Sequence, residues 1–184
     1  MVSGTGTSAT GDVAKVSLAF WKGTDTSGAA FRTVSDIDVT AGAWSHTAAA
    51  LTDGTWTVKV TQVDDVGNSF TSSGRTFLVD TAVPTSSVSS KPALRTTDRT
   101  ATFVFSTDDP DPGSAVEQVP SGVSSVLCQI DGGGYGECVS PVTYGSVGSL
   151  LPETSHTFNL KVIDGSGNES VVFSYTWVID VTAP

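Results

Sequence analysis

The sequence predicts an all-β chain built from two tandem antiparallel β-sandwiches, and three observations carry this prediction. A stretch that begins with an alternating strand occurs twice, and its landmarks are offset by 100 residues without a gap. The composition is dominated by Thr, Ser, Val and Gly, which is typical of strands and turns and not of helices. No segment shows a helical period over three turns. A repeat offset of 100 residues in a chain of 184 residues predicts two domains, each large enough to bury its own core.

The repeated stretch reads as a strand, a tight polar turn, a second strand and an exit that ends in proline. Its copies span 56–84 and 156–184, and each carries Asp-x-x-Gly-Asn in the turn and Asp-x-x-x-Pro in the exit. Asp accepts backbone N–H groups, and Gly and Asn tolerate a left-handed backbone, so these residues suit a tight turn. The exit at 80–84 is short and contains Pro84, which predicts a semi-rigid linker. We therefore expect domains at residues 1–83 and 84–184.

Alternating apolar residues place the strands of the first domain. In the segment 13–21, the side chains of Val16, Leu18 and Phe20 share one face, which we expect to be buried. Trp56, Val58 and Val60 alternate in the same way along the repeated strand. Further strands are expected near residues 30–34, 37–39, 43–47 and 75–79. Residues 1–12 are too rich in glycine for a central strand and are expected to form an edge strand or a frayed end.

The second domain shows the same alternation and one strong hairpin signal. The run Phe158, Leu160, Val162 and the run from Phe173 to Ile179 are predicted to face the core. Asp131-Gly-Gly-Gly stands between strands expected at 123–130 and 135–139, and such a run is typical of a hairpin turn. Residues 106–122 form a long polar loop.

The chain has two cysteines, Cys128 and Cys138, one on each side of this hairpin. Pairing them across the ladder would place Ile130 opposite Gly136, and directly opposed residues of an antiparallel pair lie close enough for a disulfide. We predict an intrahairpin disulfide in an oxidising compartment. A catalytic or metal-binding cysteine pair is not expected, because the spacing is wrong and no His is near.

The net charge and the motifs argue against several classes of function. The net charge of −10 disfavours nucleic acid, supplies hard oxygen ligands for Ca²⁺, and can equally serve solubility alone. We expect no membrane insertion, because no apolar run is long enough to cross a bilayer. We predict no enzyme and no catalytic residue, because the two His, His46 and His156, stand in no catalytic motif. The chain shows no signal peptide, and we expect it to be part of a longer repeat protein.

The ordered motifs resemble the bacterial Ig-like repeats that occur in tandem in large extracellular and surface-anchored proteins, including adhesins. The first copy resembles the pattern DG-aromatic-T…D-x-x-G-N…F-x-V-D-x-x-x-P between Asp53 and Pro84, with Thr55 between the Gly and the aromatic residue, and residues 3–12 resemble the opening of the same variant. The second copy carries F-x-F at Phe103 and C-x-x-D-G-G from Cys128, followed by S-P-x-x-Y from Ser140, with one extra Gly.

This resemblance implies two tandem Ig-like antiparallel β-sandwiches joined by a short linker, with the first strand of the first domain upstream of Met1. The Leu-turn-aromatic pattern before Trp56, repeated with His156, resembles the tyrosine corner of Ig-like domains. A Trp or His lacks the phenolic hydroxyl of that corner, which leaves its hydrogen bond in question.

The topology of such a sandwich predicts where the acidic residues gather. The chain leaves the first domain through Asp80, at the end where the second domain begins. The turn between the last two strands of the second domain, with Asp164 and Asn168, lies at that same end, as does the loop with Asp109 and Asp111. An interdomain Ca²⁺ site is therefore expected from Asp80, Asp164, Asn168, Asp109 and Asp111. Equivalent positions facing neighbours outside this chain are Asp64, Asn68 and Asp180. The alternative is that the carboxylates of these turns only bind backbone N–H groups.

The leading functional prediction is a structural spacer or stalk in a secreted or surface-anchored bacterial protein, projecting a distal adhesive or catalytic module. Its partners would be neighbouring Ig-like repeats of the same polypeptide. The alternative is an accessory module that binds carbohydrate or protein through the 106–122 loop or an exposed Trp. Trp56 and Trp177 fit the core alternation, which leaves Trp21 and Trp44 as candidates for an exposed platform.

Overall fold

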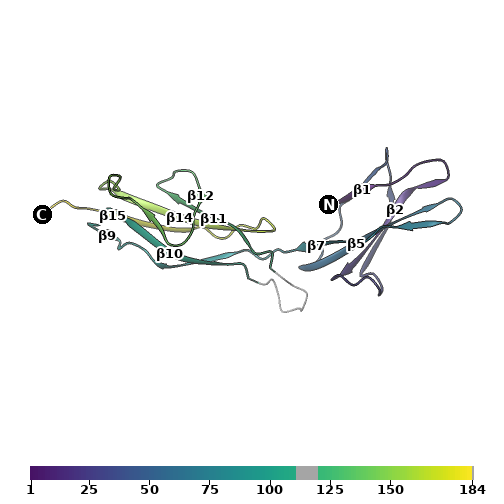
Figure 1. Ribbon diagram of the computed structural model, residues 1–184, viewed down its shortest axis with the longest axis horizontal. Helices are drawn as coiled ribbons and strands as arrows, with labels where there is room; N and C mark the ends of the chain where they lie inside the picture. Colours follow the sequence, from purple (N-terminus) through teal and green to yellow (C-terminus); the bar gives the residue numbers. More distant parts are fainter. Residues whose placement is uncertain (111–119, 184) are drawn as a thin grey trace. The chain divides into compact units, whose positions relative to one another are not determined.

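The computed structural model describes residues 1–110 and 120–183, and these residues form strands, turns and loops without a helix. Contacts divide the chain into two compact units, with the first ending at Asp80 and the second beginning at Thr81. No helix able to cross a membrane occurs in the described ranges. Each unit is a separate β-sandwich with its own core (Figure 1).

The first domain pairs a large sheet with a small one. The large sheet has the order β3-β2-β5-β6, and β7 also pairs with β5. The small sheet consists of β1 and β4. The strands are β1 (Val2–Thr5), β2 (Asp12–Lys22), β3 (Arg32–Asp38), β4 (Ala43–His46), β5 (Gly54–Asp64), β6 (Ser69–Thr71) and β7 (Arg75–Val79).

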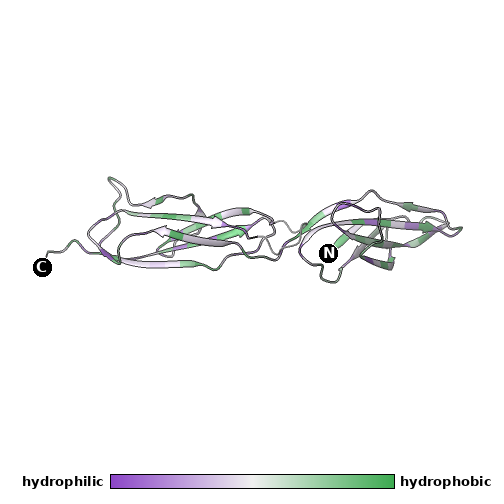
Figure 2. Cartoon of the chain, turned by 90° about the horizontal axis from the view of Figure 1, so that it is seen from below, coloured by the Kyte–Doolittle hydropathy of each residue, from purple (hydrophilic) through white to green (hydrophobic). Residues whose placement is uncertain are grey.

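The predicted inward faces of β2 and β5 form the core of the first domain. Val16, Leu18 and Phe20 are at most 2% exposed, and Trp56 is fully buried. Trp44, which the sequence left as a candidate for an exposed platform, is instead buried in the same cluster. Figure 2 shows hydrophobic and hydrophilic stretches following one another along the strands. Strand alternation therefore sets the core, as expected for a sheet with one buried face.

The second domain has three strands in one sheet and five in the other among its described residues. The sheet orders are β13-β10-β8 and β12-β11-β14-β15-β9. The strands are β8 (Thr85–Ser90), β9 (Arg95–Thr96), β10 (Ala101–Asp108), β11 (Val123–Ile130), β12 (Gly136–Glu137), β13 (Val142–Tyr144), β14 (Ser155–Asp164) and β15 (Phe173–Ile179).

Aromatic side chains from both sheets fill the core of the second domain. Phe103 of β10 and Phe158 of β14 stack with their ring centroids 3.9 Å apart, and Trp177 of β15 meets Phe103 edge to face. All three are at most 1% exposed. Phe158 and Trp177 occupy inward positions that were predicted for their strands, and their packing against Phe103 stabilises the contact between the two sheets.

The corner motif forms its hydrogen bond in both domains. The indole Nε1–H of Trp56 donates to the carbonyl of Thr52 over 2.7 Å. The Nε2 of His156 lies 3.0 Å from the carbonyl of Pro152, again four residues earlier. A carbonyl only accepts, so the ring nitrogen is the donor in this contact. His156 is 1% exposed, and its Nδ1 lies 2.7 Å from a carboxylate oxygen of Asp131. An N–H from a different aromatic ring therefore replaces the tyrosine hydroxyl.

The disulfide joins Cys128 to Cys138, with a Cα–Cα separation of 5.8 Å. The register predicted around it is wrong by two residues. Cys128 lies opposite Gly136, so the disulfide links a diagonal pair and not a directly opposed one.

The turn explains this shift. Asp131 and Gly132 both have positive φ, and the N–H of Gly133 donates to the carbonyl of Ile130. This is the tight two-residue turn typical of Asp-Gly. Cys128 therefore lies opposite Gly136, two positions earlier than a five-residue loop would place its partner.

Several further elements differ from the prediction, among them β3 and β6. The segments expected at 30–34 and 37–39 form one strand, β3. Asp36 within it has a left-handed φ of 63°, and the register between β2 and β3 shifts beside this residue, so β3 continues through an irregularity. Strand β6 was not predicted, and all three of its residues are exposed. The sequence carries little signal for such a strand because it buries no apolar face.

Candidate metal centre

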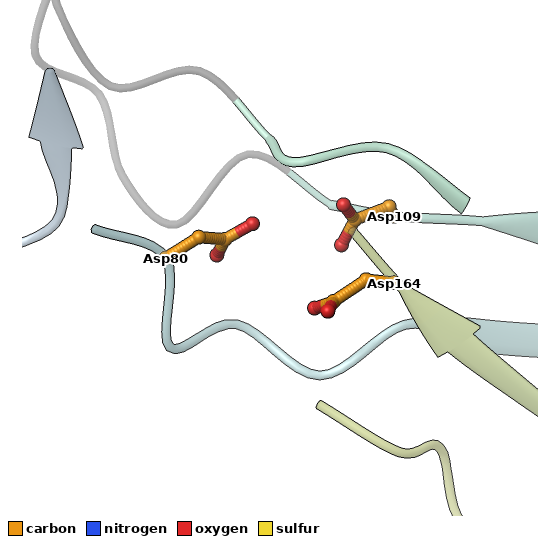
Figure 3. A group of neighbouring side chains, drawn as sticks. All are labelled: Asp80, Asp109 and Asp164. Carbon is orange, nitrogen blue, oxygen red and sulfur yellow. The ribbon is translucent and has the colours of Figure 1, made fainter. Parts of the chain in front are cut away.

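Three aspartates meet where the chain passes into the second domain. Asp80, Asp109 and Asp164 each offer a carboxylate oxygen, and these atoms all lie within 4.8 Å of one another. Figure 3 shows the three carboxylates turned toward a common space. Their side chains are buried, with exposures of 6%, 8% and 2% in that order.

The turn after β14 positions Asp164, the last residue of that strand. Its Oδ1 accepts the backbone N–H groups of Ser166 and Asn168, each over 2.8 Å. Its Oδ2 accepts the side-chain amide of Asn168 over 2.7 Å. These bonds fix the carboxylate, and a carboxylate offers about four acceptor positions in total, so capacity for a ligand remains.

The same hydrogen bonds set the charge state of Asp164. Burial acts to raise the pKa of this carboxyl, but hydrogen bonds from Asn168, Ser166 and Gly167 together outweigh burial and hold the pKa below its ordinary value. Asp164 is therefore an anion at neutral pH, as a metal ligand must be.

The residues that fix Asp109 come from the far end of the loop between β10 and β11. Its Oδ2 accepts the backbone N–H of Gly122 over 2.6 Å and lies 3.4 Å from the hydroxyl of Ser121. Gly122 has a φ of 79°, a conformation that favours glycine. The carbonyl of Gly122 in turn accepts the N–H of Gly165 over 2.8 Å, which joins this loop to the turn after Asp164.

The other oxygen of Asp109 has no hydrogen-bond partner among the described residues. Its Oδ1 is fully buried. The ion pairs found in the described part of the chain involve neither Asp109 nor Asp164. A buried carboxylate oxygen without a donor carries a desolvation penalty, which a bound cation removes. Clustered carboxylate oxygens are the ligands that Ca²⁺ prefers. The three residues thus fit a hard divalent cation.

The remaining predicted site residues fall into three groups. Asn168 is close by, but its side chain supports Asp164 within the turn. Asp111 lies outside the described residues. Asp64, Asn68 and Asp180 are not in a group of three acidic residues within the described ranges. Asp64 accepts from Asn68 in its own turn, and Asp180 accepts the N–H of Thr182.

Sequence reasoning misses the two residues that hold Asp109. Ser121 and Gly122 stand in a long polar loop, where glycine and serine are common for many reasons. Only the pairing of that loop with the turn after β14 distinguishes them. A loop–turn contact of this kind has no periodic signal in a single sequence.

The sheets and the two separate cores define two Ig-like β-sandwiches. Domains of this class are typically non-catalytic. Residues 4–81 match the family model described as bacterial Ig-like domain. The first domain is therefore similar to bacterial Ig-like domains along nearly its whole length.

A likeness among solved structures extends over both domains. The Clostridium thermocellum CbhA fibronectin(III)-like modules match at a TM-score of 0.51 and 19% identity, over 95% of this chain and 82% of that one. This likeness supports the fold alone. No curated protein matches the chain.

Proposed function

We propose that the two domains are spacer repeats of a secreted or surface-anchored bacterial protein and that they project a distal adhesive or catalytic module. The observation that carries this proposal is the repeat itself, which preserves a turn and an exit at a fixed spacing of 100 residues. Repeats of this kind bury a core each and contact mainly their neighbours along the chain. The disulfide Cys128–Cys138 is consistent with an oxidising, extracellular location.

The linker is the part on which a spacer depends. Only three residues, 81–83, separate Asp80 from Pro84, and proline restricts the backbone of the segment. A short linker with proline transmits orientation better than a flexible one. The second part of the proposal is that Ca²⁺ binds Asp80, Asp109 and Asp164 and thereby fixes this segment to the second domain.

Calcium titration calorimetry on the full chain tests the metal part. We expect binding with a dissociation constant of about 10⁻⁴–10⁻³ M, the range of extracellular calcium modules. Asp109→Asn removes one charge from the cluster and should weaken binding at least about tenfold. Asp64→Asn is the matched control, because it changes the equivalent turn of the first domain. An equal loss of Ca²⁺ affinity in both variants would show that the cation binds elsewhere.

Distance measurements between spin labels test the spacer part. Ser35 and Ser174 are exposed strand residues, one in each domain, and suit labelling. A spacer should give a narrow distance distribution in Ca²⁺ that broadens in a chelator. A distribution that stays broad in saturating Ca²⁺ would mean that the linker is a flexible tether.

The alternative of a carbohydrate- or protein-binding module has weaker support. Burial of Trp44 removes one of the two aromatic candidates for a platform. Trp21 is half-buried, its indole N–H donates to the carbonyl of Gly28, and Lys59 lies over its ring. Glycan binding that is lost on Trp21→Ala would favour this alternative.

A further inference from the structure

A two-residue segment just before β11, Ser121 and Gly122, links Asp109 to the turn after β14. The hydroxyl of Ser121 accepts the backbone N–H of Ser166 over 3.2 Å and lies 3.4 Å from Oδ2 of Asp109. The N–H of Gly122 donates to the same Oδ2 over 2.6 Å. The carbonyl of Gly122 accepts the N–H of Gly165 over 2.8 Å. We call this segment the 121–122 clamp, because it contacts Asp109 on one side and the turn on the other.

The first domain shows which of these contacts belongs to the fold in general. There the N–H of Asp65 donates to the carbonyl of Gly11 over 2.9 Å. This bond has the same place in the strand pairing as the bond between Gly165 and Gly122, since the residue after each glycine of the loop pairs with the aspartate of the turn. The bond does not by itself build a cluster, because no described group of three acidic residues includes Asp64.

The second domain adds a close approach at Gly165. A Cβ atom at this position would lie 2.7 Å from the carbonyl oxygen of Ser121, so a side chain here would force the clamp away from the turn. The first domain has Asp65 at the equivalent position, so its loop accommodates a side chain there. Glycine at position 165 thus lets the hydroxyl of Ser121 reach the turn and Asp109 together.

The clamp and the turn fix two carboxylates at a set spacing. Both oxygens of Asp164 accept hydrogen bonds from Asn168 in the turn, and the clamp holds Oδ2 of Asp109. Oδ1 of Asp109 is buried without a hydrogen-bond partner among the described residues, which leaves it available to a cation. Two oxygens up to about 4.8 Å apart can both contact Ca²⁺ through bonds of about 2.4 Å, whereas Mg²⁺, with bonds of about 2.1 Å, needs them within about 4.2 Å. Carboxylates that cannot move closer together therefore favour the larger ion.

We propose that the 121–122 clamp sets the cation selectivity of this site, with Ser121 as a positioning residue that keeps Asp109 at a spacing suited to Ca²⁺ and not to Mg²⁺. This role presupposes the proposed Ca²⁺ site. Ser121 acts through Asp109 and does not itself contact the cation. Discrimination between the two ions depends on the size of the site and on the flexibility of its ligands, and loss of the clamp releases Asp109.

Calorimetric titration of the full chain with Ca²⁺, and separately with Mg²⁺, tests the proposal. Ser121→Ala should weaken Ca²⁺ binding about tenfold and Mg²⁺ binding less, so that the ratio of the two affinities falls at least about threefold. Ser121→Thr keeps the hydroxyl and should restore the ratio of the parent chain. Ser166→Ala is the matched control, because Ser166 is exposed and contributes its backbone N–H to these contacts. It should bind both ions as the parent chain does.

Gly165→Ala provides an independent variant, because it displaces the clamp without changing a carboxylate or a hydroxyl. It should lower the affinity ratio as Ser121→Ala does, with the fold of both variants checked by their amide spectra. A parent chain that binds Ca²⁺, together with an unchanged ratio in both variants, would overturn the role of the clamp and leave the Ca²⁺ site in place. An equal loss of affinity for both ions would also overturn it, since Ser121 would then support the fold alone. A parent chain that binds no Ca²⁺ would overturn the site and the clamp together.

Discussion

Asp64 and Asp164, 100 residues apart, make the same hydrogen bonds in the same turn, yet Asp64 is half-buried and Asp164 is 2% exposed. Each accepts the backbone and side-chain N–H groups of the Asn four residues later. The difference lies in their neighbours, because Asp164 alone has a second carboxylate, Asp109, against it among the described acidic clusters. Turn chemistry thus explains why Asp occurs at both positions, and the buried cluster needs a separate explanation.

Asp109→Asn should stabilise the second domain in a chelator and should lose most of this advantage in Ca²⁺. In a chelator the amide relieves repulsion between buried carboxylates and its N–H₂ donates to them, so the second domain should gain about 1–3 kcal/mol. In Ca²⁺ this gain should shrink or vanish, because the variant has lost a ligand and is stabilised less by the cation than the parent chain is. Urea unfolding followed by amide signals of the second domain measures both. Stabilisation of equal size in the two conditions would show that Ca²⁺ does not use this residue.

Acid stability should depend on the turn asparagines. The pKa of Asp164 is lowered, so its stabilisation is complete above the ordinary value of 3.8 and is lost as pH falls through the lower folded value. Asn168→Ala removes the side-chain donor and should raise the pKa of Asp164, which moves acid unfolding of the second domain to higher pH. Titration of the carboxyl carbon signal measures the pKa directly.

Asn68→Ala gives the parallel test in the first domain. The pKa of Asp64 is also lowered, mainly by the side-chain hydrogen bond from Asn68. The variant should shift the titration of Asp64 upward and leave that of Asp164 in place. A shift at both sites would indicate a general change in the fold.

Trp56→Phe should destabilise the first domain by about 2–4 kcal/mol, because it removes a buried ring and leaves the carbonyl of Thr52 without its donor. Trp21→Phe is the control, since the indole of Trp21 is half-buried and its loss should cost about 1 kcal/mol. Urea unfolding measures both differences. A similar loss of unfolding free energy in both variants would argue against a stabilising role for the hydrogen bond between Trp56 and Thr52.

Removal of the disulfide by a Cys128→Ser, Cys138→Ser double variant should destabilise the second domain by about 2–3 kcal/mol, because the bond closes a loop with a sequence separation of 10. The first domain should unfold at the same urea concentration as before. An unchanged second domain would mean that the hairpin is held by its hydrogen bonds and packing alone.

The sequence predicts most of this fold because its signals are local and repeated. Val16, Leu18 and Phe20 alternate along β2 as expected, and the repeated strand sets the cores of both domains. The prediction that Asp80 contributes to a site with Asp164 rests on the rule that loops gather at the ends of a sandwich, combined with the repeat.

The parts that sequence reasoning misses depend on contacts without a periodic signal. The register at Cys138 depends on whether the hairpin turns in two residues or five, and a run of glycines allows both. Trp44 sits on a short strand, where alternation is too brief to assign a face. Ser121 reaches the acidic cluster only through the contact between its loop and the turn after β14.

Thermal unfolding with and without a chelator tests the central claim most directly. If Asp80, Asp109 and Asp164 hold Ca²⁺, a concentration 10–100 times the dissociation constant should stabilise the second domain by about 1–3 kcal/mol. This corresponds to a rise in its midpoint of roughly 5–15 °C, reversed by EDTA and reduced by Asp109→Asn. A midpoint that is the same in Ca²⁺ and in EDTA would contradict the account and leave the cluster as a feature of the turns alone.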